Sequence, residues 1–237
     1  MDRIIETAKK VAEQAGGLTF SDPVHTVYNP IQYAWKAHKM YLEKWGAPPK
    51  EVVLVGMNPG PWGMVQTGVP FGEVSLVRDW LGIEEEIEQP ETVHPRRPIE
   101  GFACKRSEVS GARLWGWARD RFGSPAHFFS RFFVYNYCPL AFMEESGRNR
   151  TPDKLPAAEK NALFEFCDRA LLETVSALNP SFVIGIGRFA EERARAALDG
   201  TPLTVGRILH PSPASPLANR GWSEAAEKGL ASYGIVP

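Results

Sequence analysis

Residues 52–72 read VVLVGMNPGPWGMVQTGVPFG, and the beginning of this stretch decides the fold. Val52–Val55 is an uninterrupted apolar run, typical of a strand buried on both faces. Gly56 ends the run, and Asn58-Pro59-Gly60-Pro61 predicts a rigid turn at the strand's carboxyl end. In open α/β sheets, ligands bind beyond the carboxyl ends of the strands. Asn58 is therefore a candidate functional side chain, although a purely structural turn would have the same composition.

The rest of the chain alternates strands with helices. Further strands are expected at 131–136, 181–187 and 203–210, and helices at 1–15, 28–45, 74–81, 110–122, 155–178, 188–198 and 216–231. Between them, residues 89–107 are rich in Pro, His, Arg and Gly and predict a long surface loop. The alternation favours an α/β fold whose parallel, doubly wound sheet has helices on both faces. No repeat or interdomain linker interrupts the pattern, so we expect a single domain over residues 1–237.

Composition narrows the function classes. The formal net charge is −1, so any contact with nucleic acid has to come from a local patch rather than from an overall excess of Lys and Arg. No apolar run approaches the roughly 20 residues that a membrane span needs, and no signal peptide opens the chain. The three cysteines are far apart, which predicts neither a disulfide framework nor a metal cluster. We expect an intracellular protein, placed in the cytoplasm or nucleoid if it is bacterial, with no membrane partner.

Gly185-x-Gly187 follows a predicted strand and hints at dinucleotide binding. The third position of that motif is Ala190, and no acidic residue ends a strand about 20 residues further on. We interpret the glycines as a sign of close helix–strand packing. A nucleotide-binding regulatory domain, which binds without chemistry, stays open as the alternative function.

Polar side chains end three of the predicted strands or the turns that follow them. Asn58, Asn136 and His210 hold these positions. Each has a structural interpretation, because a buried Asn often caps a turn and a His beside Pro is usually structural. Since the carboxyl ends of parallel strands meet at one edge of a sheet, we expect the three to converge in one site.

Five stretches together resemble a known family. They are GMNPGPWGMVQTGVPFGE (residues 56–73), SEVSGARLW (107–115), FVYNYCPL (133–140), VIGIGRFAEERARAAL (183–198) and HPSPASPLANRGW (210–222). Their residues, order and spacing resemble those of the single-strand-selective monofunctional uracil-DNA glycosylases, within the uracil-DNA glycosylase superfamily. The resemblance implies a three-layer αβα sandwich around four parallel strands. It also implies an enzyme that flips uracil out of single-stranded and double-stranded DNA and hydrolyses the N-glycosidic bond. We expect a monomer that needs no cofactor and no metal.

The resemblance assigns catalysis to Asn58 and His210. His210 would donate a hydrogen bond to uracil O2 as negative charge builds on the leaving base. Asn58, a neutral amide, would hold the attacking water without acting as a strong base. Asn136 would read the N3–H and O4 of uracil, because its amide carries one acceptor and a donor pair in one plane. Phe71 would stack on the base, although an ordinary core Phe is the alternative.

Three further residues complete the expected substrate-binding set: Met57, Gly60 and Met64. Gly60 stands where the best-known uracil-DNA glycosylases carry a Tyr that blocks a 5-methyl group. The small residue leaves room for uracil with polar 5-substituents, such as 5-hydroxymethyluracil. Thymine would be rejected because its methyl group displaces a water molecule without replacing that water's hydrogen bonds. No Lys in the motifs offers a Schiff-base nucleophile, so we expect an abasic product without strand cleavage.

DNA contacts are expected from the loop after His210 and the helix it enters, at Pro211, Ser212, Pro213, Ala214 and Arg220. The family carries Arg where this chain has Ala214, at the tip of the loop that enters the duplex. In the 89–107 loop, His94, Arg96 and Arg97 have two interpretations, contact with a phosphate backbone or simple solvation. We favour solvation.

Overall fold

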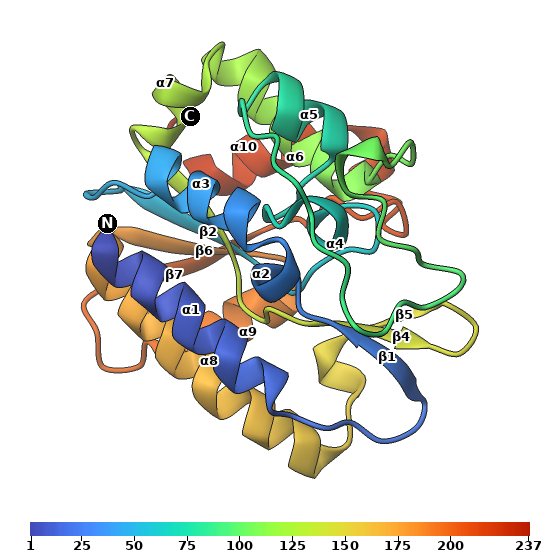
Figure 1. The fold of residues 1–237 in the computed structure, drawn as a ribbon. Coiled ribbons are helices and arrows are strands. Elements are labelled where there is room, and N and C mark those ends of the chain that lie inside the picture. Colours follow the sequence, from blue (N-terminus) through green and yellow to red (C-terminus); the bar gives the residue numbers. More distant parts are fainter.

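The computed structural model describes residues 1–237, and a four-stranded sheet forms its centre (Figure 1). The strand order is β3-β2-β6-β7, with bounds Phe132–Asn136, Val52–Gly56, Phe182–Ile186 and Thr204–Ile208. All neighbouring strands pair in parallel, so that Leu54 lies beside Val134 on one side and Ile184 on the other. Every residue of β2 is buried, as its apolar run predicts. The four predicted strands and their parallel arrangement are confirmed.

Helices cover both faces of this sheet (Figure 1). On one face lie α1 (Asp2–Gly16), α8 (Ala157–Leu178) and α9 (Arg188–Ala197). On the other lie α3 (Trp35–Trp45), α5 (Val74–Asp79), α6 (Val109–Phe122), α7 (Pro125–Phe129) and α10 (Trp222–Ala231). The predicted three-layer αβα sandwich is therefore confirmed.

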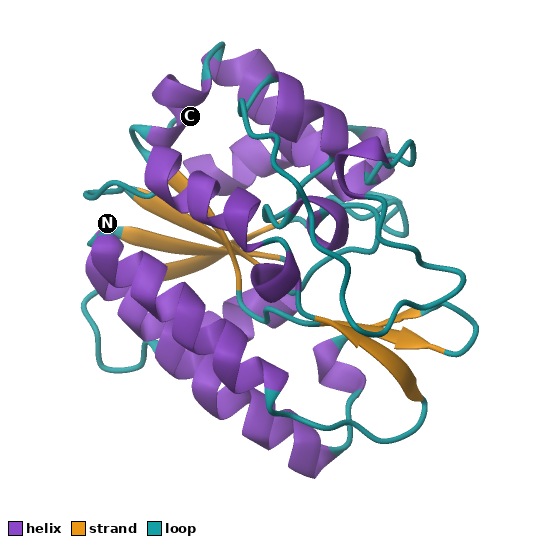
Figure 2. Cartoon of the chain, in the orientation of Figure 1, coloured by secondary structure: helices purple, strands orange, loops and turns teal.

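A second, antiparallel sheet was not predicted. It has the order β1-β4-β5, with bounds Val24–Tyr28, Ala141–Glu144 and Asn149–Arg150. Figure 2 shows it as a small group of orange strands separate from the central sheet. Because only residues 137–140 connect β3 to β4, the small sheet starts where β3 ends. It therefore stands beside the edge of the central sheet at which we expect the site.

Two of the predicted helices are wrong in part. Residues 28–45 contain the end of β1, the short helix α2 (Pro30–Tyr33) and then α3, because Pro30 starts a new helix and is not tolerated inside one. Residues 216–231 contain a 3₁₀ turn at Ala218–Arg220 before α10 begins. Gly221 separates the turn from α10 with a φ of +137°, which is unfavourable for a residue with a side chain. A short helix, α4 (Met64–Thr67), also lies within the opening stretch.

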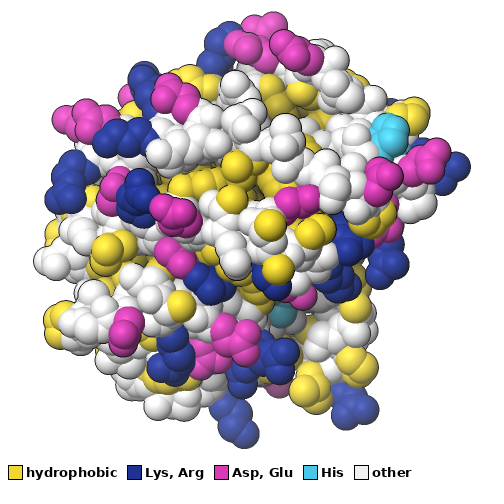
Figure 3. Space-filling view, turned by 90° about the horizontal axis from the view of Figure 1, so that it is seen from below, with side chains coloured by type: hydrophobic (Ala, Val, Ile, Leu, Met, Phe, Trp, Pro, Cys, Tyr) yellow, Lys and Arg dark blue, Asp and Glu magenta, His cyan; other side chains and the backbone are white.

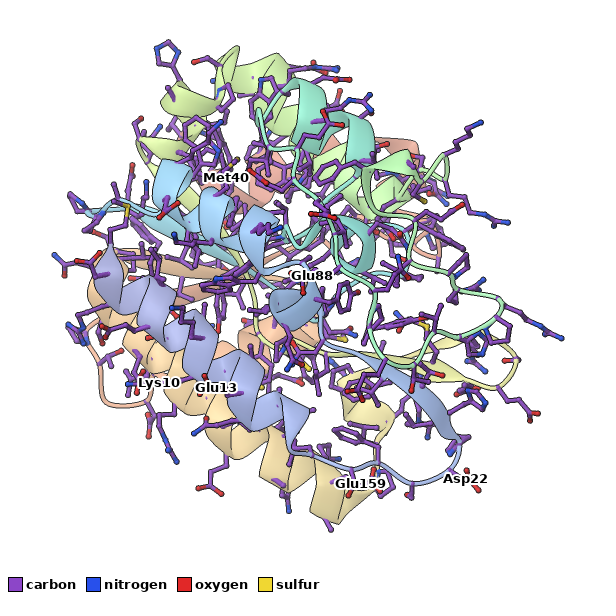
Figure 4. The ribbon with its side chains drawn as sticks, viewed as in Figure 1. Lys10, Glu13, Asp22, Met40, Glu88 and Glu159 are labelled. Atoms are coloured by element: carbon purple, nitrogen blue, oxygen red, sulfur yellow. The ribbon has the colours of Figure 1, made fainter.

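The segment before β1 is fixed to the first turn of α8. Glu159 accepts hydrogen bonds from the backbone N–H and the hydroxyl of Ser21, at 3.0 and 2.5 Å. Figure 4 shows Glu159 and Asp22 at this end of the molecule, whereas Lys10 and Glu13 lie along α1. These hydrogen bonds connect the small sheet to the helical layer beneath the central sheet.

The surface carries both signs of charge. Figure 3 shows Lys and Arg side chains interspersed with Asp and Glu on the face that it presents, in keeping with a net charge of −1. None of the helices combines the length and the apolar character that crossing a membrane would require.

Candidate active site

A cavity of about 320 Å³ opens beyond the carboxyl ends of the central strands. The predicted convergence is present, because Asn58, Asn136 and His210 all line this cavity. The other lining residues are Met57, Gly60, Pro61, Met64, Phe71, Glu108, Ser110, Asn149, Thr151 and Ser212. The cavity thus includes every residue predicted for catalysis and substrate binding, together with residues from α6 and the small sheet.

The amide of Asn58 has a defined orientation. Its Nδ2 donates a 3.2 Å hydrogen bond to the carbonyl oxygen of Leu140, the residue before β4. Because the donor side of the amide is engaged there, Oδ1 is left as an acceptor for a ligand or a water molecule in the cavity. The small sheet therefore helps to orient the first candidate residue.

Asn136 presents an unused acceptor at the end of β3. Its Nδ2 lies 3.3 Å from Sδ of Met64, which accepts weakly, while its Oδ1 is buried and has no hydrogen-bond partner. A buried acceptor without a partner costs about 1–3 kcal/mol. The cavity therefore suits a ligand that brings an N–H group to Asn136.

Phe71 is held against Asn136 by unusual backbone geometry. Its φ is +54°, a left-handed conformation that residues with a side chain seldom adopt. A Cβ atom on Gly56 would lie 2.5 Å from Phe71 Cε2 and 2.4 Å from Asn136 Oδ1, so only glycine allows both groups to come so close. Phe71 packs against the core, but it is only partly buried and also lines the cavity.

His210 is a neutral hydrogen-bond donor. The backbone N–H of Ser212 donates to its Nδ1 at 3.0 Å, so the hydrogen of the neutral ring lies on Nε2. Burial lowers the pKa of His210 from 6.5 to about 4. Its ring centroid lies 6.2 Å from that of Phe71. The site therefore combines an aromatic surface with a donor that is uncharged at neutral pH.

The glycines of the dinucleotide-like motif have packing roles. A Cβ atom on Gly185 would lie 2.3 Å from the backbone nitrogen of Glu191, which leaves space only for close contact between β6 and α9. Gly187 has a φ of +92°, and its own Cβ would lie 3.2 Å from Cβ of His210. The interpretation of this motif as close helix–strand packing is therefore confirmed.

The loop after His210 is fixed by Arg113 of α6. The guanidinium donates to the carbonyl oxygen of Pro211 at 2.9 Å and to Oδ1 of Asn219 at 2.8 Å. Asn219 in turn donates to the carbonyl oxygen of Pro213 at 2.9 Å. Among the predicted DNA-binding residues, Ser212 lines the cavity, Pro211 is buried beneath the loop, and Pro213, Ala214 and Arg220 are exposed outside the cavity.

Sequence reasoning assigned no role to four lining residues: Glu108, Ser110, Asn149 and Thr151. Burial raises the pKa of the Glu108 carboxyl, and the backbone of Trp62 and Ser110 offsets only part of that rise. A Cβ atom on Gly60 would lie 2.6 Å from Oε2 of Glu108. Asn149 has a buried Oδ1 without a partner. Glu108 and Ser110 lie in SEVSGARLW, one of the five stretches that resemble the family, so the sequence contained a signal for them. Asn149 and Thr151 lie outside those stretches.

His94 is neither solvated nor free to contact a phosphate. It is 1% exposed, and its Nε2 lies 3.2 Å from the carbonyl oxygen of Glu145. Its Nδ1 accepts a 3.1 Å hydrogen bond from the backbone N–H of Arg96. Nε2 therefore joins the 89–107 loop to the hairpin between β4 and β5, and Nδ1 fixes the turn within the loop, which corrects the solvated interpretation of His94.

Comparison with known proteins agrees with this geometry. Residues 43–228 match the model of the uracil DNA glycosylase superfamily. The single-strand selective monofunctional uracil-DNA glycosylase of Rattus norvegicus is 49% identical over 235 residues, covering 98% of this chain and 84% of the relative. The corresponding protein of Bos taurus is 50% identical over 222 residues, covering 93% and 82%.

A solved structure shares the fold at low sequence identity. Wild-type SMUG2 of Pedobacter heparinus superimposes with a TM-score of 0.67 and 17% identity, over 96% of this chain and 97% of that one. The full-length sequence matches confirm the family that the five motifs indicate. The chain belongs to the single-strand-selective monofunctional uracil-DNA glycosylase family of the uracil-DNA glycosylase superfamily.

Proposed function

We propose that this DNA glycosylase binds a flipped uracil in the 320 Å³ cavity and hydrolyses its N-glycosidic bond. The observation that carries the proposal is the buried, unpartnered Oδ1 of Asn136. Uracil N3–H is a donor for this oxygen, and O4 can accept from the Nδ2 of the same amide. Phe71, fixed beside Asn136, offers the base a stacking surface worth roughly 1–3 kcal/mol.

The two catalytic residues divide the work by their chemistry. His210 donates from Nε2 to uracil O2, where negative charge develops as the bond breaks. Asn58 uses its free Oδ1 to place a water molecule for attack on the anomeric carbon. A neutral amide takes no proton near pH 7, so this scheme requires a dissociative, oxocarbenium-like transition state that needs little nucleophilic assistance. No lysine lines the cavity, which fits base removal without a lyase step.

Base selection follows from the fixed amide. Cytosine presents an acceptor at N3, so it would face Oδ1 of Asn136 without a hydrogen bond, at a cost of ~1–3 kcal/mol per unpaired group. Gly60 has no side chain, and the nearby Glu108 carboxyl forms a polar boundary to the space beside it. Uracil with a polar 5-substituent, such as 5-hydroxymethyluracil, is therefore a further substrate, whereas thymine is excluded.

Single-stranded and double-stranded DNA both serve as substrates in this proposal, and the chain acts as one domain and as a monomer. The fixed loop of Pro211–Ala214 supplies backbone groups to phosphates. Binding of a nucleotide without chemistry is the alternative. The packing of α9 against Gly185 disfavours it, because a dinucleotide pyrophosphate would need that space.

A uracil-containing oligonucleotide tests the proposal directly. The enzyme is incubated with end-labelled single-stranded, U:A and U:G substrates, and a thymine oligonucleotide of the same sequence is the control. We expect an alkali-labile abasic site at uracil only, with no strand break before alkali treatment. Absence of this product, combined with measurable nucleotide binding, would support the alternative.

A further inference from the structure

The arginines without an ion pair gather around the cavity. Ten other arginines contact a carboxylate within 4.0 Å. Apart from Arg3 in α1, the unpaired ones are Arg96, Arg97, Arg106, Arg113, Arg148 and Arg220. They lie in the 89–107 loop, the β4–β5 hairpin, α6 and the loop before α10, all of which border the cavity or hold its walls. A chain with a net charge of −1 thus has a local surface of unneutralised positive charge.

Two of these arginines stack on one tryptophan. Trp62 directly follows Pro61, which lines the cavity. The guanidinium carbon of Arg97 lies 5.1 Å from the centroid of the Trp62 ring, and that of Arg106 lies 4.6 Å from it. Two cations therefore share one aromatic surface at the edge of the cavity. Such cation–π contacts are worth about 0.5–1 kcal/mol each at exposed sites.

The backbone around Arg97 is fixed. Its N–H donates to the carbonyl oxygen of His94 at 2.9 Å, and its own carbonyl oxygen accepts from the Tyr28 hydroxyl at 2.6 Å. The Tyr28 hydroxyl also accepts from the backbone N–H of His94 at 2.8 Å. Since Tyr28 is fully buried, these hydrogen bonds hold Arg97 beside the ring.

Most of the donors on the two guanidiniums have no acceptor. Nη1 of Arg97 donates to the carbonyl oxygen of Arg96 at 2.9 Å, and its Nε is buried without a partner. Arg106 is exposed and makes neither an ion pair nor a side-chain hydrogen bond. Nη2 of Arg97 and the whole guanidinium of Arg106 are thus without an acceptor, and phosphate oxygens suit such guanidinium donors. An anion would also relieve the repulsion between two cations on one ring.

We propose that Trp62, Arg97 and Arg106 form a phosphate subsite that holds the DNA strand beside the flipped nucleotide. The proposal rests on the proposed function, because it takes DNA as the substrate. The subsite is separate from the loop of residues 210–222, because it is built from the turn that follows Asn58 and from the 89–107 loop. It fixes the strand through phosphates and is therefore independent of base sequence.

The salt dependence of DNA binding tests the subsite. The affinity for a uracil-free single-stranded oligonucleotide is measured over a range of salt concentrations with the wild type and with Arg97→Gln/Arg106→Gln. Each phosphate contact on a single strand contributes about 0.7 to the slope of log K against log salt. We expect the double variant to lower the magnitude of that slope by about 1.4. A slope equal to that of the wild type would overturn the subsite.

A matched control removes two cations elsewhere. Arg3→Gln/Lys9→Gln neutralises two exposed α1 side chains that form no ion pair, and Lys9 also lies over an aromatic ring, 5.5 Å from the centroid of Trp35. We expect its slope to stay near that of the wild type. If this control lowers the slope as much as the double variant does, net charge alone is responsible and the subsite is wrong.

Variants of Trp62 separate stacking from charge. Trp62→Ala keeps both arginines but removes the aromatic ring that they contact, and we expect it to lower the magnitude of the slope. Trp62→Phe keeps an aromatic ring and should retain the slope of the wild type. An unchanged slope in Trp62→Ala would contradict the role of the ring. Thermal unfolding is used to check that each variant is folded. Arg106→Gln alone changes an exposed residue, and it should lower the magnitude of the slope by about 0.7.

The binding measurement does not depend on excision. If the wild type removes uracil and the slopes of the wild type and the double variant agree, the subsite is wrong and the proposed function stands. If the wild type binds DNA with the expected slope difference but leaves uracil intact, the proposed function fails and the subsite stands.

Discussion

The backbone N–H of Ser212 donates a 3.0 Å hydrogen bond to Nδ1 of His210, which leaves the ring hydrogen on Nε2. Burial lowers the pKa of this histidine to about 4, so the neutral donor is present throughout the neutral and mildly acidic range. We predict that single-turnover excision changes by less than about twofold between about pH 5.5 and 7.5. For an imidazole with an ordinary pKa near 6.5, the neutral fraction would fall about tenfold from the upper to the lower end of this range. A rate profile with an inflection near pH 6.5 would contradict the assignment.

Stability has to be followed in the same experiment. Because the pKa of His210 is lower in the folded protein than in the unfolded chain, the unfolded chain binds more protons between about pH 4 and 6.5. The buried His38, whose pKa burial also lowers to about 4, acts in the same direction. The free energy of unfolding therefore falls as pH decreases through this window. Rates are compared only where thermal unfolding shows that the enzyme is folded.

Asn58→Ala should remove most turnover while leaving DNA binding. The change deletes Oδ1, the proposed water acceptor, and one hydrogen bond to Leu140 at the surface of the cavity. We expect single-turnover excision to fall at least about tenfold, which corresponds to ~1.4 kcal/mol, with DNA affinity within about twofold of the wild type. Excision that stays within twofold of the wild type would show that Asn58 does not position the water.

Asn136→Asp should change base selection. A protonated carboxyl group at this buried position can donate to N3 of cytosine, whereas an ionised one repels the O4 of uracil. We expect weaker uracil excision and detectable cytosine excision, increasing at low pH. Asn149→Asp is the matched control, because Asn149 lines the same cavity and also has an unpartnered Oδ1. Cytosine excision by the control as well, or normal uracil excision by Asn136→Asp, would rule out the base-reading role.

The central sheet could be predicted because its signals are local. In β2, β3 and β7, the polar residue that ends the strand or its turn lies within a few residues of the strand itself, and in β2 the Pro/Gly turn follows the apolar run directly. Parallel topology then brings Asn58, Asn136 and His210 together without further information. The rest of the fold depends on pairing between distant segments. The strands β4 (Ala141–Glu144) and β5 (Asn149–Arg150) are too short to show a period of their own.

The site residues that could not be predicted from the sequence also depend on contacts between distant segments. Glu108 reaches the cavity because α6 packs tightly on the turn at Phe71, where a Cβ atom on Gly111 would lie 2.1 Å from the Phe71 carbonyl oxygen. Arg97 and Arg106 meet Trp62 only because the 89–107 loop folds back on the hairpin through His94. No spacing within the sequence records these contacts, which are set by tertiary packing.

Gly60→Ala should narrow the proposed space for a 5-substituent. The added Cβ would lie 2.6 Å from Oε2 and 3.0 Å from Cδ of Glu108, so the carboxyl has to move. Overpacking of this kind costs ~1–3 kcal/mol, and we expect the ratio of 5-hydroxymethyluracil to uracil excision to fall about tenfold. Adding Glu108→Ala removes the contact and should restore most of the ratio.

A glycine elsewhere provides the control for this pair. A Cβ atom on Gly116 in α6 meets nothing within 4 Å, so Gly116→Ala should leave both activities unchanged. Gly60 and Glu108 do not form the boundary of the 5-substituent space if Gly60→Ala lowers the excision of both bases equally. The same conclusion follows if adding Glu108→Ala does not restore the ratio of the two excision rates.

Ala214→Arg should favour duplex substrates. Ala214 is exposed on a loop that Arg113 and Asn219 hold in place, and its N–H donates to the Ser212 hydroxyl at 3.2 Å, so a long side chain fits without rearrangement. An arginine there would fill the gap that the extruded base leaves in the stack. Single strands have no partner base to hold open. We therefore expect single-turnover excision to increase several-fold on U:A DNA and much less on single-stranded DNA.

Added charge by itself would also attract phosphates, and that contribution decreases as salt rises. Both substrates are therefore compared at low and high salt with Ala162→Arg as the control, which places the same charge at an exposed position of α8. The duplex preference of Ala214→Arg should persist at high salt and be absent from Ala162→Arg. An equal gain on both substrates, or a gain that the control reproduces, would mean that charge rather than insertion into the duplex is responsible.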